Sequence, residues 1–438
     1  MMRFDHPSLP GSAPLRWIPA LKPGELRSAV EGALCDIVQS MPLPGEGGSG
    51  VTVAGGEAGH AVFYAYLACS AFLGVKSDDH HARARNHMQA AVDGIAHLMG
   101  RPDLYGGFTG IGWAADHLHV LGVLEDDELC VYIDEALVAW LTRESDVLSC
   151  ELIRGLAGVG VYGIARRHKA DGREILRLVV KALESSAVVH QGHRTWFSTP
   201  GNYRYPYSSS HQSGCYNLGV SHGVPGAVNF LAQAAEHGVA GAQALARDAG
   251  AWLLLQQRIY RNGSRFGYEF VSDPMENAAG SRVAWCYGDL GISAALISSM
   301  RRLKHSDGEL QALDIARAVA LRRTEDGDVR DAGLCHGAIG NAHIFNRLYA
   351  ATGEHCFVDA MHSWLRVGLG MRRPGMGLAG FNAWQPPRVG EAERDPWQPV
   401  AGFLEGIGGI GLALLGFLAP IEPAWDQLLM VDIPTKAA

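Results

Sequence analysis

The chain has 438 residues, of which 47% are hydrophobic, and its formal net charge is -8 at pH 7. This length and apolar content allow a large core, whereas the negative charge gives no reason to expect nucleic acid or an anionic membrane surface as a partner. No basic amino-terminal segment precedes an apolar run, and glycines interrupt every long apolar stretch, so we expect a cytoplasmic protein without a membrane span.

The chain begins with an irregular segment and continues as a long series of helices. Residues 1–24 are rich in proline and lack periodicity, which indicates an arm. Amphipathic helical patterns follow, with charge on one side and Leu, Ala, Val or Ile on the other. They cover residues 25–41, 81–99, 126–144, 172–189, 240–258, 309–324 and 356–371. Asp171 with Glu174, and Ser306 with Glu309, have the spacing of a capping box at two of the starts.

A second, nearly uncharged kind of helix alternates with the first, and each begins at a Gly-x-x-Gly step. The steps begin at Gly56, Gly107, Gly155, Gly223, Gly288, Gly337 and Gly406. A helix that is apolar on all sides must be enclosed, as in 59–73, 291–299 and 409–419. Repeats at this spacing predict one array, here an all-α double ring with seven inner and seven outer helices. The glycines would let the backbones of inner helices approach at one rim.

Strand signals are few, and two connections are long. Residues 265–271 alternate in a way that fits a short β arm, a hairpin. Residues 190–217 contain Trp196, Phe197, Tyr203, Tyr205 and Tyr207, and residues 372–401 contain Phe381, Trp384 and Trp397. Long structured loops are often functional, so these two either form a groove for an extended peptide or cap the mouth of the ring.

Cysteine and histidine gather directly in front of three of the steps. Counted from the first glycine of its step, Cys286 and Cys335 share position minus two, and His222 and His336 share position minus one. All four therefore project at one rim, where helix amino-termini lower the pKa of a thiol. Cys286, Cys335 and His336 form a zinc ligand set with an open fourth position, as in catalytic sites. The alternative is that they are buried cysteines and a capping histidine.

The charge of this ligand set indicates what the metal would do. Two thiolates and a neutral imidazole balance the charge of Zn²⁺, which makes the centre a weak Lewis acid but leaves it able to deprotonate a thiol with a free pKa of about 8.5. The set therefore favours alkylation of a thiol over hydrolysis by zinc-bound water. No His-Glu-x-x-His segment is present.

Three segments give the chain its resemblance to a known family. They are SHGVPG at 221–226, WCYGDLGI at 285–292 and LCHGAIGN at 334–341. With GLAGVG at 155–160 and GIGGIG at 406–411, they resemble the lanthipeptide (lantibiotic) synthetase C family, the LanC-like cyclases, over about residues 45–417. The resemblance implies an (α/α) toroid with one cyclase domain over 25–425 and a tail at 426–438.

The resemblance also implies the chemistry. Such cyclases add cysteine thiols of a precursor peptide to dehydroalanine or dehydrobutyrine and so close thioether rings. By motif match, Cys286, Cys335 and His336 take the positions of the zinc ligands, and His222 and Arg282 those of an active-site histidine and arginine. Glu151 stands where the family usually has aspartate, and it would orient His222; Asp146 is a nearby alternative.

Partners and rival functions follow from the same comparison of motifs. A dehydrated precursor peptide is the expected substrate, with a separate dehydratase and an exporter as further partners in a biosynthetic complex. One rival is a zinc enzyme that resembles protein prenyltransferases, which use a carboxylate among their metal ligands. The other is a non-catalytic LanC-like protein that binds zinc and thiols such as glutathione.

Overall fold

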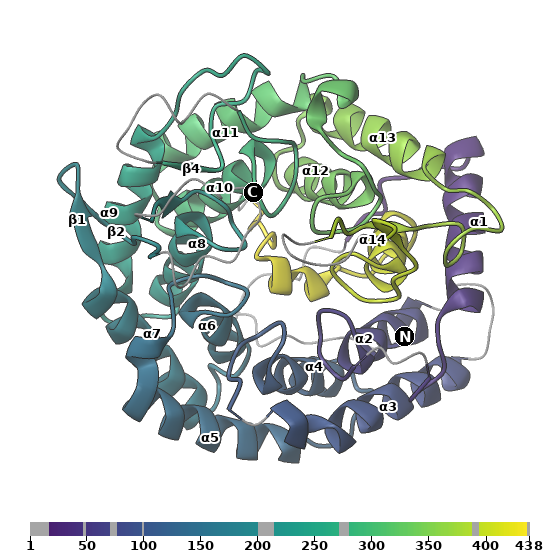
Figure 1. The fold of residues 1–438 in the computed structure, drawn as a ribbon, viewed down its shortest axis with the longest axis horizontal. Helices are drawn as coiled ribbons and strands as arrows, with labels where there is room; N and C mark the ends of the chain where they lie inside the picture. Colours follow the sequence, from purple (N-terminus) through teal and green to yellow (C-terminus); the bar gives the residue numbers. More distant parts are fainter. Residues whose placement is uncertain are drawn as a thin grey trace.

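The computed structural model describes residues 17–46, 50–70, 77–98, 100–199, 214–270, 280–387 and 394–435. Within these residues, fourteen α-helices form two concentric rings (Figure 1). The inner helices are α2 (Glu57–Ser70), α4 (Phe108–Val120), α6 (Leu156–Ala165), α8 (Val224–Glu236), α10 (Asp289–Arg302), α12 (Ala338–Thr352) and α14 (Ile407–Leu418). The predicted all-α toroid of seven inner and seven outer helices is confirmed.

The outer helices alternate with the inner ones along the chain. They are α1 (Glu25–Ser40), α3 (Ser77–Asp93), α5 (Glu128–Glu144), α7 (Ala170–Ser186), α9 (Ala242–Leu255), α11 (Ser306–Ala320) and α13 (His355–Gly370). Short 3-10 turns are η2 (Ile95–Leu98), η3 (Ser145–Val147), η6 (Thr324–Gly327) and η7 (Ala424–Leu429). The ring closes because α14 contacts both α1 and α2.

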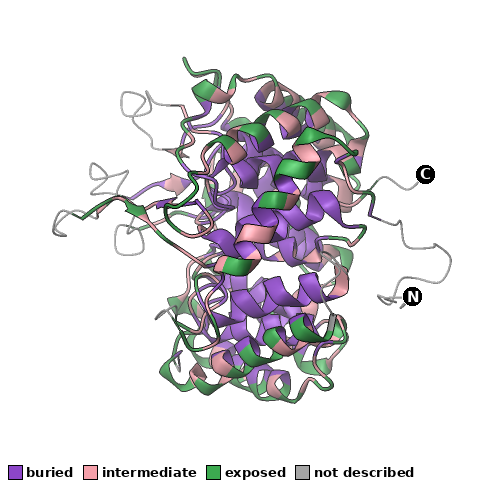
Figure 2. Ribbon diagram, turned by 90° about the vertical axis from the view of Figure 1, so that its right-hand side faces the viewer, coloured by how far each residue is buried: buried purple, intermediate pink, exposed green. Residues whose placement is uncertain are grey.

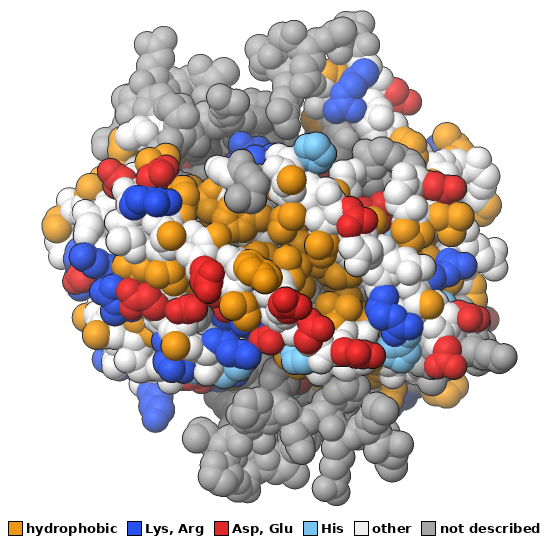
Figure 3. Space-filling model, turned by 90° about the horizontal axis from the view of Figure 1, so that it is seen from below, with side chains coloured by type: hydrophobic (Ala, Val, Ile, Leu, Met, Phe, Trp, Pro, Cys, Tyr) orange, Lys and Arg blue, Asp and Glu red, His pale blue; other side chains and the backbone are white. Residues whose placement is uncertain are grey.

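The burial of the helices agrees with the apolar and amphipathic sequence patterns. Every residue of α14 is buried, whereas α7 buries only one stripe, so the apolar helices form the inside of the ring (Figure 2). Seen from the side of α3 and α5, hydrophobic side chains lie between acidic and basic ones on the outer surface (Figure 3). Among the exposed apolar side chains of α5 are Val131 and Tyr132. Within the described part of the chain, no helix is long and apolar enough to cross a bilayer.

The Gly-x-x-Gly steps have a steric cause. In all seven repeats, a Cβ on the second glycine would lie 1.8–2.5 Å from the carbonyl oxygen of the residue six positions earlier. For Gly409 that oxygen belongs to Phe403, and for Gly291 it belongs to Trp285. The backbone that approaches each inner helix is therefore the loop of its own repeat, and the prediction that neighbouring inner helices approach one another at these glycines is wrong.

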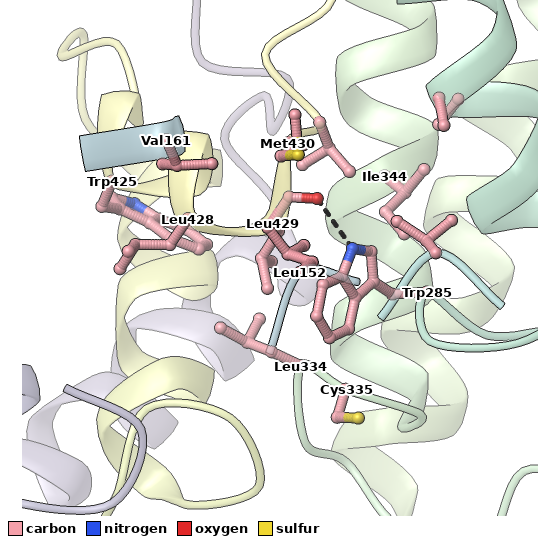
Figure 4. Close-up of a cluster of buried hydrophobic side chains, with 14 of the residues drawn as sticks. Leu152, Val161, Trp285, Leu334, Cys335, Ile344, Trp425, Leu428, Leu429 and Met430 are labelled. Carbon is pink, nitrogen blue, oxygen red and sulfur yellow. Dashed lines mark hydrogen bonds between the residues drawn. The ribbon is translucent and has the colours of Figure 1, made fainter. Parts of the chain in front are cut away.

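The carboxyl-terminal segment fills the centre of the ring. Three buried side chains on inner-ring elements, Tyr105, Asn229 and Trp285, donate hydrogen bonds to the successive carbonyls of residues 428–430 at 2.6–2.8 Å. Figure 4 shows the bond from the Trp285 indole to the carbonyl of Leu429 amid buried hydrophobic side chains. Residues 428–430 form the end of η7, whose Trp425 is fully buried, and the position after it. The middle of the toroid is a packed core.

The strands are short, antiparallel pairs that extend to one side of the ring (Figure 2). The pairs are β1 (Val188–His190) with β2 (His193–Thr195), β3 (Tyr216–Asn217) with β4 (Glu269–Phe270), and β5 (Ala383–Trp384) with β6 (Trp397–Gln398). The expected β arm within 265–271 contains the strand β4, but β4 pairs with β3 and not within its own segment, and the rings of Tyr216 and Phe270 pack together.

Candidate thiol and metal site

A closed ring of backbone hydrogen bonds aligns the seven repeats. The residue two positions before each Gly-x-x-Gly step donates its N–H to the carbonyl of the equivalent residue in the next repeat, at 2.9–3.5 Å. In order, these residues are Ala54, Tyr105, Ile153, Ser221, Cys286, Cys335 and Leu404, and Leu404 donates back to Ala54. Equivalent positions therefore lie side by side around the ring.

This alignment brings the three predicted metal ligands together. One candidate ligand atom from each of Cys286, Cys335 and His336 lies within 4.8 Å of the other two. The cysteines are only 5% and 8% exposed, and each stands three residues before the first residue of an inner helix, α10 or α12. The eight cysteines of the chain are all free thiols, so no disulfide competes for either sulfur.

Hydrogen bonds and burial set the protonation of the cluster. A hydrogen bond from Cys335 holds the pKa of Cys286 well below its usual value against the effect of burial, with further help from His336 and Arg282. The same bond, with burial, raises the pKa of Cys335. Burial lowers the pKa of His336, but its bond to Cys286 and the charge of Asp331 outweigh this and raise it to about 9. A cation bound here would therefore displace protons from Cys335 and His336.

Asp331 is a further residue of this site, and it is not among the residues predicted from the sequence. It is 2% exposed, and its Oδ2 lies 3.6 Å from Nε2 of His336 while accepting the N–H of Trp384 at 2.8 Å. Asp331 therefore joins the imidazole to β5, and such carboxylates orient histidine ligands. A sequence signal exists: Asp331 and Arg282 both stand six residues before the first glycine of their steps.

Glu151 contacts His222, as predicted, although the two residues belong to different repeats. The imidazole Nδ1 lies 2.7 Å from Oε2 of Glu151. The same carboxylate accepts the backbone N–H groups of Ile153 and Arg154, which fix its position. Glutamate therefore reaches the histidine from the position at which the family usually has aspartate. Asp146 is exposed on η3 and does not substitute for it.

Tyr287 extends the row of side chains between the two histidines. Like His222 and His336, it directly precedes a Gly-x-x-Gly step, and this shared position is the signal that would have found it. Its ring centre lies 6.4 Å from that of His222, and its hydroxyl accepts a hydrogen bond from Asn217 at 3.0 Å. The rim thus presents His222, Tyr287 and His336 from three successive repeats.

A pocket of about 190 Å³ opens beside the cluster. Its lining residues are Arg282, Asp328, Arg330, His336, Trp384 and Pro386. The guanidinium of Arg330 lies over the ring of Trp384 at 4.9 Å, and Trp384 packs edge-on against Trp397. The loop 372–401 therefore supplies a wall of the pocket, although Phe381 of that loop is buried.

The other long loop contributes less to the described surface. Trp196 is buried and donates to the carbonyl of Leu183 on α7, so it anchors the β1–β2 hairpin and does not line a groove. Phe197 is 39% exposed. Tyr203, Tyr205 and Tyr207 lie outside the described residues.

Comparisons with known proteins identify the family and support the fold. The profile of the family described as "Lanthionine synthetase C-like protein" matches residues 50–430. The chain belongs to this family. Among solved structures, a nisin cyclase has a TM-score of 0.70 at 19% sequence identity, with 93% of this chain and 97% of that chain covered. A sugar epimerase from a ruminal bacterium covers 90% of this chain and 98% of its own, with a TM-score of only 0.44 at 10% identity.

The family match and the structural similarity to nisin cyclase support different conclusions. The structural similarity supports only the toroid fold, because the sequence identity is low. Membership in the lanthionine synthetase C-like family indicates a cyclase enzyme, as the sequence predicts.

Proposed function

We propose that the protein is a zinc-dependent lanthipeptide cyclase. It adds cysteine thiols of a dehydrated precursor peptide to dehydroalanine or dehydrobutyrine and forms lanthionine or methyllanthionine rings. The juxtaposition of Cys286, Cys335 and His336 beside the Glu151–His222 pair is the observation that carries the proposal. A dehydratase has to act on the peptide first, and it and an exporter are the proposed partners.

The donor set fits zinc. Two sulfurs and one imidazole are ligands that Zn²⁺ prefers, and three protein ligands leave one position for a substrate. Zn²⁺ held there would favour the thiolate form of the substrate cysteine without quenching its nucleophilicity. Within the described residues, the ligand cluster contains no carboxylate, which argues against the prenyltransferase-like alternative.

His222 has the position and partner of a general acid. Attack of a thiolate on the β-carbon of the dehydro residue leaves an enolate, and its α-carbon then needs a proton. Because Glu151 engages Nδ1 of His222, we assign the donation of this proton to Nε2. Removal of His222 slows protonation but leaves the thiol-binding cluster intact.

Arg282 supplies positive charge next to the cluster. It lines the pocket together with His336, and its charge already lowers the pKa of Cys286. During the addition, negative charge develops on the carbonyl oxygen of the dehydro residue, and a guanidinium at this place stabilises it. The adjacent Trp384 offers an apolar surface to the peptide on the same side.

The test is a reaction with a synthetic peptide that contains one dehydroalanine and one cysteine. Loss of free thiol is followed with a thiol reagent, because cyclisation leaves the mass unchanged. We expect the protein to accelerate the loss well above the protein-free rate, and His222→Asn to fall close to that rate with unchanged zinc content. A protein that binds the peptide or glutathione without accelerating thiol loss would be the non-catalytic thiol-binding protein instead.

A further inference from the structure

A second cluster of potential metal ligands lies in the first repeat, away from the predicted zinc ligands. Glu57 and His60 stand one turn apart at the start of α2, and His87 reaches them from α3. One ligand atom from each lies within 4.8 Å of the other two. All three residues are buried, with 4%, 0% and 1% exposure. A carboxylate and two imidazoles are unusual among fully buried side chains, and two of the three lie on the otherwise apolar helix α2.

The imidazoles of this cluster lack the partners that buried polar groups normally have. Among the described residues, no hydrogen-bond partner is found for either ring nitrogen of His60 or for Nε2 of His87. Burial, together with the nearby His87, lowers the pKa of His60 to about 4 against the opposing effect of the Ala401 backbone. Buried groups of this kind are found paired with protein, water or a metal.

The carboxylate is held in place from both sides. Oε2 of Glu57 lies 2.6 Å from Nδ1 of His87, and Oε1 accepts the backbone N–H of Gly45 at 3.1 Å. Tyr64 stacks on the His87 ring at 5.3 Å, and Arg83 donates to the Tyr64 hydroxyl at 3.0 Å. These contacts orient the three potential ligands, as the outer partners of a metal site do.

We propose that Glu57, His60 and His87 form a second metal site that holds a first-row divalent cation such as Zn²⁺. Two imidazoles and one carboxylate are a known ligand set for such cations. The site joins α2 to α3 in the repeat that closes the ring against α14. The three residues are buried, so the cation has a structural role. The proposal does not depend on the proposed cyclase activity.

Cobalt distinguishes the two clusters, because only the Cys286–Cys335–His336 cluster contains thiolates and gives a strong sulfur-to-cobalt absorption band. The metal-stripped wild-type protein is titrated with Co²⁺ and the bound metal is measured. We expect two equivalents per chain, with the band saturating after one. The Cys286→Ala/Cys335→Ala double variant should bind one equivalent without the band.

Substitutions on α2 and α3 locate the second equivalent. His60→Leu should bind one equivalent of Co²⁺ and keep the full band. His80→Leu is the matched control and should bind two, because His80 is a buried histidine of α3 that also stacks on Tyr64 but lies outside the cluster.

The wild-type stoichiometry and the double variant test the proposal even if His60→Leu does not fold. One equivalent with the full sulfur-to-cobalt band in the wild type, or no bound metal in the double variant, would overturn it. So would two equivalents in a folded His60→Leu variant.

Discussion

The backbone N–H of Cys286 donates to the carbonyl oxygen of Cys335 at 3.2 Å, which ties the two thiol positions of neighbouring repeats together. This bond is one of seven that run around the ring. Because each bond joins equivalent positions, a side chain's place at the rim depends on its offset from the Gly-x-x-Gly step. The repeat therefore determines where the side chains of the proposed site lie. The repeats differ in function because different residue types occupy the same positions relative to the Gly-x-x-Gly step.

Glu151 acts through His222 and not on the substrate. Replacement with Gln removes the charge that engages Nδ1, so we expect kcat to fall about 10–100-fold, the range seen for carboxylates that orient metal-bound histidines. KM and zinc content should stay unchanged, because Glu151 is no part of the metal cluster. Steady-state rates of thiol loss and metal analysis on the same preparation check this.

Glu151→Asp is the matched control for that substitution. It restores the charge and the residue type that the family usually has at this position, so most of the activity should return. If Glu151→Gln cyclises at the wild-type rate, His222 does not need this partner.

The second glycine of each Gly-x-x-Gly step is required because a Cβ there would clash with the backbone. In Gly409→Ala, the new methyl group meets the carbonyl of Phe403, so we expect the free energy of unfolding to fall by about 3 kcal/mol. Gly32 on α1 is the control, because it is exposed and a Cβ there meets nothing within 4 Å. Gly32→Ala should raise the free energy of unfolding by about 1 kcal/mol through helix propensity. Denaturant unfolding of both variants measures the contrast, and equal effects would rule out the steric account.

Asp289 makes stability depend on pH. Burial raises its pKa to about 6, although it accepts the N–H groups of Arg265 and Phe266. In the unfolded chain the pKa is about 3.9, so between pH 4 and 6 the folded state binds more protons. The free energy of unfolding should therefore fall by about 3 kcal/mol as the pH rises through this window, relative to Asp289→Asn.

Denaturant unfolding of both proteins between pH 4 and 7 tests this difference. A constant difference across the range would show that Asp289 ionises in the folded protein as it does in the unfolded chain.

The sequence predicts the double ring because its two signals are strong and regular. Apolar and amphipathic helices alternate seven times, and each inner helix follows its glycine step. Exact starts are less predictable: Asp171 and Ser306 are not the capping residues, since α7 and α11 begin one residue after Lys169 and His305. His305 itself accepts the N–H of Gly308, a role that the capping-box pattern does not anticipate.

Local sequence patterns do not predict long-range contacts. The pairing of β4 with β3 joins segments some fifty residues apart, and nothing in 265–271 specifies its partner. The carboxyl-terminal segment has too few residues to show a period, yet the Trp285 indole and two other side chains bind it in the centre of the ring. Asp331 is a different case: it contacts His336 within the same loop before α12, and only comparison of the repeats at the same offset points to it.

Removal and return of zinc test the central claim most directly. The protein is stripped with a chelator, and the rate of thiol loss from the dehydroalanine–cysteine peptide is measured as Zn²⁺ is added back. We expect activity to be lost on stripping and to return with Zn²⁺ in the wild type. It should also return in Cys356→Ser, a variant of the half-buried cysteine on α13, but not in Cys335→Ala. Full activity in the stripped protein, or in Cys335→Ala, would contradict a zinc-dependent cyclase at this site.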